Sequence, residues 1–138
     1  MLKGTSVDIL QKCLKDRITI RPGAKTLFST FKKLLGKTAI VSGGFTFFSE
    51  AISKELSVDF NYANILEFNQ NKLTGGIIGP VLNAKRKELI LTHLCEKLNI
   101  DHSKSLAVGD GNNDINMVSL AGLGVAFKGS AKLRKKAK

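Results

Sequence analysis

Apolar residues recur at every third or fourth position in several stretches of the chain, which is the spacing of one face of a helix. Helices are therefore predicted over residues 2–16, 22–35, 46–56, 84–98 and 115–120. Thr5 or Ser6 is expected to cap the first of these helices, and Gly36 is expected to end the second.

Short β-prone runs lie between the predicted helices. Strands are expected over residues 38–41, 61–68, 73–78, 105–108 and 123–127. The polar residues 69–72 separate two of these runs and predict a hairpin. The remaining strands alternate with helices, which is typical of an α/β fold with a parallel sheet.

The composition is that of a globular protein with a strongly basic charge. The chain has 138 residues, enough for one domain, of which 43% are hydrophobic and 24% charged. Its net charge of +11 would suit a nucleic acid or another anionic partner. Stacking aromatic residues are not interleaved with the cations, so a solvated basic surface is preferred and no nucleic acid is expected. No apolar run reaches the roughly 18 residues of a membrane span, and no signal peptide is recognisable, so a cytoplasmic location without a membrane partner is expected.

Two glycine-containing loops follow predicted strands, at the edge of the sheet where α/β proteins bind ligands. In the first loop, Ser42 offers a hydroxyl, and Gly43 and Gly44 allow backbone N–H groups to approach an anion at the start of the next helix. An ordinary turn is the alternative interpretation. The loop therefore indicates a phosphate site only in combination with other features.

The second loop contains Asp110 and Asp114, whose carboxylates are ligands suited to Mg²⁺. The alternative is an Asx turn followed by a helix cap. Gly109 and Gly111 hold Asp110 at the end of a strand, where a carboxylate does not build a core, so the metal site is preferred. Asp114 is interpreted either as a second metal ligand or as a supporting or capping group.

Both loops resemble sequence motifs of phosphoserine phosphatases in the haloacid dehalogenase superfamily. Val41-Ser42-Gly43-Gly44-Phe45 is similar to their second motif, and Gly109-Asp110-Gly111-Asn112-Asn113-Asp114 is similar to their fourth. The resemblance extends over nearly the whole chain and includes residues 22–24, 71–75 and 121–127. It implies a Rossmann-like, three-layer α/β fold with a parallel sheet and a small antiparallel hairpin.

The resemblance also implies a function for several residues. Ser42, the Gly43 N–H group and Asn113 would bind the phosphate of phosphoserine, and a lysine would neutralise charge during phosphoryl transfer. Lys85 and Lys87 compete for that function, and the family spacing, counted back from the motif aspartate, selects Lys87. Asp110 would bind Mg²⁺ and Asp114 would complete or support the metal site. The implied reaction is Mg²⁺-dependent hydrolysis of phosphoserine through an aspartyl-phosphate, as in serine biosynthesis.

The chain departs from the family pattern in one respect. The first motif of the family carries two aspartates, a nucleophile and a general acid, and no such motif occurs in these 138 residues. Asp8 and Asp16 lie in a stretch that resembles the end of the family's helical cap, so neither replaces them. The expected organisation is therefore a cap remnant over residues 1–17 and a truncated core over residues 18–138.

The missing motif has a structural consequence as well as a chemical one. In the family its strand lies between the strand that ends at Ser42 and the strand that ends at Asp110, so a central strand is expected to be absent. A second chain that supplies this strand, or a homodimer, would close the gap, and the chain alone is expected to be inactive. The alternatives are half of a split phosphatase, a non-catalytic phosphate-binding relic and, with less support, a basic nucleic-acid-binding protein.

Overall fold

The computed structural model describes residues 2–137, which form two compact units. The first unit runs to Val81 and contains α1 (Val7–Arg17), α2 (Ala24–Lys33), β1 (Ala39–Phe45), α3 (Thr46–Leu56), β2 (Phe60–Asn69) and β3 (Lys72–Ile78). The second begins at Leu82 and contains α4 (Ala84–Lys97), β4 (Leu106–Gly109), α5 (Ile115–Leu120), β5 (Leu123–Ala126) and α6 (Ala131–Arg134), with short 3₁₀ helices η1 (His102–Lys104) and η2 (Asn112–Asp114). The predicted division at residue 17 stays a prediction, and its end positions, 1 and 138, lie outside the described residues.

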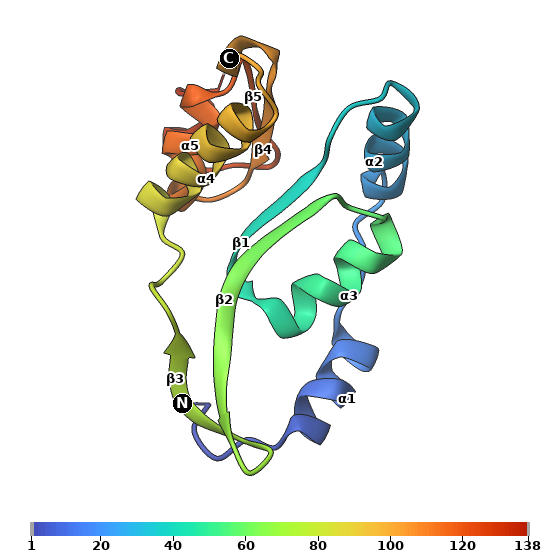
Figure 1. The fold of residues 1–138 in the computed structure, drawn as a ribbon, viewed down its shortest axis with the longest axis vertical. Helices are drawn as coiled ribbons and strands as arrows, with labels where there is room; N and C mark the ends of the chain where they lie inside the picture. The colour runs from blue at the N-terminus through green and yellow to red at the C-terminus, as the bar shows by residue number, and fades with distance from the viewer. Residues whose placement is uncertain (1, 138) are drawn as a thin grey trace. The chain divides into compact units, whose positions relative to one another are not determined.

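The first unit is built on a mixed sheet with the strand order β1-β2-β3. β1 pairs with β2 in parallel, and β2 pairs with β3 as an antiparallel hairpin, which confirms that prediction. Gln70 and Asn71 turn the hairpin with positive φ angles of 45° and 62°. α3 packs on β2 (Figure 1). A cluster of apolar side chains forms the core of this unit: Leu10, Leu66 and Leu73, with Phe45, Phe47 and Phe48 packed against them.

The prediction for the start of the first helix is wrong. α1 begins at Val7 rather than near residue 2, and Ser6 makes no side-chain capping hydrogen bond. Instead, Ser6 pairs with Lys72 as an isolated antiparallel bridge, and the Leu73 N–H donates to the Thr5 carbonyl at 2.9 Å. The hairpin, far away in the sequence, satisfies the backbone groups that a helical first turn would have used.

The second unit is a smaller α/β arrangement around two parallel strands, β4 and β5. Their register pairs Leu106 with Leu123 and Gly109 with Ala126, so both strands end at the same edge. α4 packs on α5, and α5 packs on both strands. The buried apolar side chains include Leu94, Ala107, Met117, Val118 and Leu133. The predicted α/β class is confirmed. Within residues 2–137, no helix has the length and apolar character needed to span a membrane.

Asp59 joins the starts of β1 and β2. Its carboxylate accepts hydrogen bonds from the Lys37 ammonium at 3.1 Å and from the N–H and hydroxyl groups of Thr38, both at 2.9 Å. Burial alone would raise the pKa of Asp59. The hydrogen bonds and the charge of Lys37 outweigh burial and lower the pKa from 3.8 to about 2. The charged form of Asp59 therefore stabilises the fold.

We predict that Asp59→Asn lowers the free energy of unfolding by roughly 1 to 2 kcal/mol at neutral pH. Because the pKa of the folded state lies below the ordinary value, the stabilisation is complete above about pH 4. It is lost as the pH falls through about 2. Urea unfolding of both proteins between pH 2 and pH 7 measures the difference, with Asp8→Asn as the surface control. A difference that stays constant across this range would contradict the prediction.

The end of α2 places a leucine in a conformation that favours glycine. Leu35 has a φ of 58°, and its side chain is 92% exposed. The Leu35 N–H donates to the Lys32 carbonyl, and the Gly36 N–H donates to the Phe31 carbonyl at 2.8 Å, which is the pattern of a Schellman cap. The glycine predicted to end the helix therefore lies one position after the left-handed residue.

Replacing this leucine should stabilise the protein. We expect Leu35→Gly to raise the free energy of unfolding by about 0.5 to 1 kcal/mol, because glycine adopts the left-handed conformation without the steric cost of a Cβ atom. Leu34→Gly is the matched control, because Leu34 has an ordinary φ of −86° and gains nothing from glycine. Thermal unfolding compares the two variants, and equal effects would show that the backbone conformation is not the cause.

Candidate active site

The glycine segment after Val41 is part of β1 rather than a turn after it. β1 continues to Phe45, and its register with β2 is irregular between Val41 and Phe45. The Ser42 hydroxyl accepts a hydrogen bond from the Gly44 N–H at 3.0 Å, and Gly43 and Gly44 are exposed. α3 begins directly afterwards at Thr46. The segment therefore presents exposed backbone and a hydroxyl immediately before a helix, where an anion is favoured.

Asn64 is a residue of this segment that the sequence analysis missed. It lies in β2, is 8% exposed, and donates from its side-chain amide to the Gly43 carbonyl at 2.8 Å. This hydrogen bond holds the exposed glycine backbone against the neighbouring strand. A signal was present in the sequence, because a polar residue stands beside the apolar pair Ile65 and Leu66 in a run predicted to be a strand.

The second segment, residues 109–114, is called the acidic loop here, and its central contact is a buried ion pair. The Lys87 ammonium on α4 donates to Asp114 Oδ1 at 2.6 Å, and each residue is 5% exposed. The other carboxylate oxygen, Oδ2, accepts hydrogen bonds from the N–H groups of Asp110 and Gly111 at 3.1 and 3.0 Å. Asp114 therefore joins α4 to the end of β4.

The electrostatics keep this pair charged. Burial raises the pKa of Asp114, but the hydrogen bond from Lys87, the charge of Lys87 and the N–H groups of Gly111 and Asp110 outweigh it, so the pKa lies below its ordinary value. Lys85, the competing lysine, is exposed and pairs with Glu88 on its own helix at 3.0 Å. Of the two competing lysines, Lys87 is thus the one that reaches the acidic loop.

Two glycines allow the acidic loop to close on itself. A Cβ atom on Gly109 would lie 2.4 Å from the Asp114 Cβ, and one on Gly111 would lie 2.6 Å from the Asn113 Oδ1. Real Cβ atoms do not approach so closely. A side chain at Gly109 would therefore displace Asp114, whereas one at Gly111 would displace only the end of the exposed Asn113 side chain. Gly109 is therefore required by close approach.

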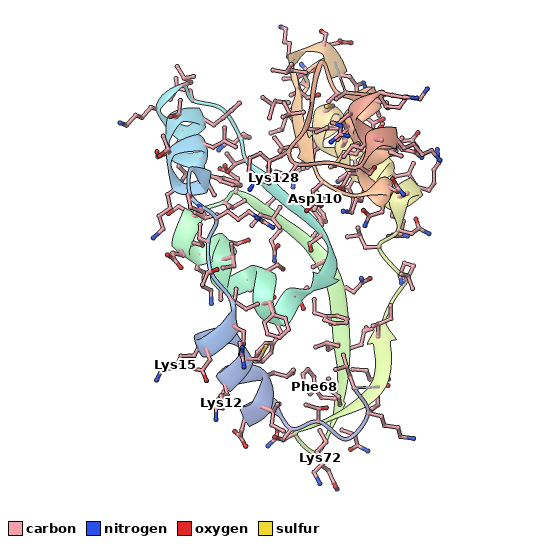
Figure 2. All side chains as sticks on the ribbon, turned by 180° about the vertical axis from the view of Figure 1, so that it is seen from behind. Lys12, Lys15, Phe68, Lys72, Asp110 and Lys128 are labelled. Carbon is pink, nitrogen blue, oxygen red and sulfur yellow. The ribbon has the colours of Figure 1, made fainter. Side chains whose placement is uncertain are left out.

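Asp110 directly follows β4 and is exposed (Figure 2). Within the described residues its carboxylate makes no hydrogen bond or ion pair, so both oxygens can bind a ligand. A hard cation such as Mg²⁺ fits this donor. Residues 2–137 contain no group of three or more His, Cys, Asp or Glu side chains that could hold a metal ion.

The structure thus brings together part of the predicted site. Lys87, Asp110 and Asp114 are linked by hydrogen bonds in the second unit, and Asn113 lies exposed in the same loop. The predicted phosphate-binding groups Ser42 and Gly43 lie in the first unit.

Residues 7–122 match a hydrolase family, the haloacid dehalogenase-like hydrolases, and the chain belongs to this family. Its α/β fold, with parallel and antiparallel strands, is the fold of this family. Within the family the chain is similar to phosphoserine phosphatases, as the sequence resemblance indicated. It is 38% identical over 136 residues to a probable phosphoserine phosphatase of Schizosaccharomyces pombe, covering 97% of this chain and 45% of the relative. It is 40% identical to the phosphoserine phosphatase of Haemophilus influenzae, covering 99% of this chain and 43% of the relative.

Solved structures give the same relationship. A probable phosphoserine phosphatase from Vibrio cholerae matches 99% of this chain with a TM-score of 0.92 and 38% identity, over 42% of its own length. A substrate-bound phosphoserine phosphatase matches 99% of this chain with a TM-score of 0.93 and 36% identity, over 65% of its own length. The chain thus spans less than half of the two curated relatives and about two thirds of the substrate-bound structure.

The buried ion pair predicts a large difference between the two competing lysines. Lys87→Met should lower the free energy of unfolding by about 3 kcal/mol, because it leaves the Asp114 carboxylate buried without its partner. Lys85→Met removes only an exposed ion pair and should change the free energy of unfolding by less than about 1 kcal/mol. Urea unfolding of both variants measures the difference, and similar values would show that the Lys87–Asp114 pair is not buried in solution.

Proposed function

We propose that these 138 residues supply the phosphate-binding, lysine and metal-binding part of a phosphoserine phosphatase. The observation that carries the proposal is the Lys87–Asp114 contact of 2.6 Å, which holds a buried ammonium group against the acidic loop. A cation next to a hard-metal ligand suits a phosphomonoester, whose charge has to be neutralised during phosphoryl transfer. The similarity to a substrate-bound phosphoserine phosphatase supports phosphoserine as the substrate.

The residues of the chain have distinct functions in this proposal. The Ser42 hydroxyl and the Gly43 N–H group bind phosphate oxygens, and Asn113 contributes an amide from the acidic loop. Lys87 has three N–H donors, of which Asp114 accepts one at short distance, so others remain for a phosphate oxygen. Asp114 already fixes the position of the Lys87 ammonium group, so substrate binding does not have to immobilise it.

Asp110 would hold Mg²⁺, which when bound would supply positive charge beside the phosphate. Asp114 is proposed to support this ligand rather than to bind the metal directly. Both of its oxygens already accept hydrogen bonds, from Lys87 and from the N–H groups of Asp110 and Gly111. The sequence had left this choice open between a second ligand and a supporting group.

The nucleophile is proposed to come from residues outside these 138. No Asp-x-Asp sequence occurs in the chain, and the reaction requires one aspartate to attack phosphorus and a second group to protonate the departing serine oxygen. Water would then hydrolyse the aspartyl-phosphate and release phosphate. β1 lies at one end of its sheet and β4 at one end of its pair, so each has an edge that an added strand can use. By family resemblance, the enzyme would act in the cytoplasm.

A reconstitution experiment tests this function. Phosphate release from phosphoserine is measured with Mg²⁺ for this chain, for a segment carrying the first motif of the Haemophilus influenzae relative, and for the two mixed. We expect activity only in the mixture, because the nucleophile and Lys87 then act on one phosphate.

Asp110→Asn is the control, and it should abolish activity in the mixture while the chain stays folded. Turnover by this chain alone would contradict the account of the nucleophile. Binding of the two parts without turnover would favour the rival function, a non-catalytic phosphate-binding module.

A further inference from the structure

The segment that follows β5 folds back over the acidic loop. The Phe127 N–H donates to the Gly109 carbonyl at 2.9 Å, and the Ser130 N–H donates to the Asp110 carbonyl at 3.3 Å. Lys128 lies between these two hydrogen-bonded residues in the sequence, and Figure 2 labels it together with Asp110. Residues far from the acidic loop in sequence thus border its proposed metal ligand.

Ser130 makes a second connection to the loop through its hydroxyl. The hydroxyl donates to the Asn112 Oδ1 at 2.7 Å and accepts from the Leu133 N–H at 3.2 Å, which caps α6. Leu133 is fully buried, so the capped turn is anchored in the core. Because the Leu133 N–H fixes one side of the oxygen, the hydroxyl proton has a defined direction toward Asn112.

Asp110 is therefore positioned through its backbone on both sides. Its N–H donates to Asp114 Oδ2, and its carbonyl accepts from the Ser130 N–H, while its own carboxylate makes no hydrogen bond or ion pair within residues 2–137. The direction of that carboxylate depends on how firmly these two hydrogen bonds hold the backbone. Partners that orient a metal ligand affect metal affinity strongly without touching the metal.

We propose that Ser130 is a positioning residue for Asp110 and Asn112, so that the segment after β5 is part of the metal-binding site. The inference rests on the proposed function of Asp110 as a metal ligand. It adds a residue that no phosphatase motif in the sequence analysis contains. Loss of the hydroxyl would release Asn112, remove the α6 cap and loosen the Ser130 N–H from the Asp110 carbonyl.

The chain offers a matched control in Ser105. Its hydroxyl also donates to an acceptor, the His102 carbonyl at 2.6 Å, and accepts a backbone N–H, from Gly122 at 3.4 Å. These contacts lie at the opposite ends of β4 and β5, before the strands begin. Ser105→Ala thus removes a similar pair of hydrogen bonds from the same unit without touching the acidic loop.

The test uses Mn²⁺, which prefers oxygen ligands as Mg²⁺ does and broadens nearby NMR signals. Broadening of the Asp110 and Gly111 amide signals is followed during titration of the whole chain. We expect Ser130→Ala to weaken Mn²⁺ binding about tenfold. Ser130→Thr should restore the affinity because it keeps the hydroxyl, and Ser105→Ala should leave it unchanged.

Equal affinity of wild type and Ser130→Ala would overturn the proposal, as would an equal loss in Ser105→Ala or no broadening at Asp110 in the wild type. Thermal unfolding shows that each variant is folded. The outcome of this Mn²⁺ titration does not depend on the outcome of the reconstitution experiment. Ser130-dependent Mn²⁺ binding together with a silent phosphatase mixture would refute the proposed function and retain the positioning.

Discussion

The buried ion pair between Lys87 and Asp114 is the interaction on which the second unit depends. Removing two charges from water is costly, and their attraction offsets that cost only when their remaining hydrogen-bonding groups are also satisfied. Asp114 meets this requirement with its second oxygen, which accepts the N–H groups of Asp110 and Gly111. The composition of the acidic loop follows from this, because Gly109 leaves room for the Asp114 side chain.

In the first unit, the carboxylate of Asp59 also joins separate segments, but it holds two strands together rather than fixing a lysine. Asp59 binds Lys37 and Thr38 immediately before β1 begins, whereas Ser42 lies in the middle of that strand. It is more exposed than Asp114, at 21% of its side chain against 7%. Asp59 therefore fixes the pairing of two strands, whereas Asp114 fixes the ammonium group of Lys87 against the acidic loop.

The sequence predicted most elements correctly because their periodicity is local. It failed where partners distant in the sequence decide the conformation. The residues before Val7 pair with the hairpin instead of starting a helix, and Gly43 and Gly44 remain in β1 because Asn64 holds the segment to β2. The choice between Lys85 and Lys87 depended on family spacing, since both lysines have the same chemistry. Ser130 could not be found, because its importance comes from the contact with Asn112 and from no motif.

The same physical constraints connect the proposed metal site to the proposed nucleophile. Asp110 offers one carboxylate, whereas both carboxylate oxygens of Asp114 already accept hydrogen bonds. Mg²⁺ requires near-octahedral coordination by oxygen ligands. Water can fill some positions, but a single exposed carboxylate compensates little of the cost of dehydrating the ion. In the proposed function, a first motif outside these 138 residues would supply a further carboxylate and a carbonyl as well as the nucleophile. One added strand would therefore complete both the metal site and the chemistry. On this account, the affinity for Mg²⁺ should rise when that strand is supplied, and phosphatase activity should appear with it.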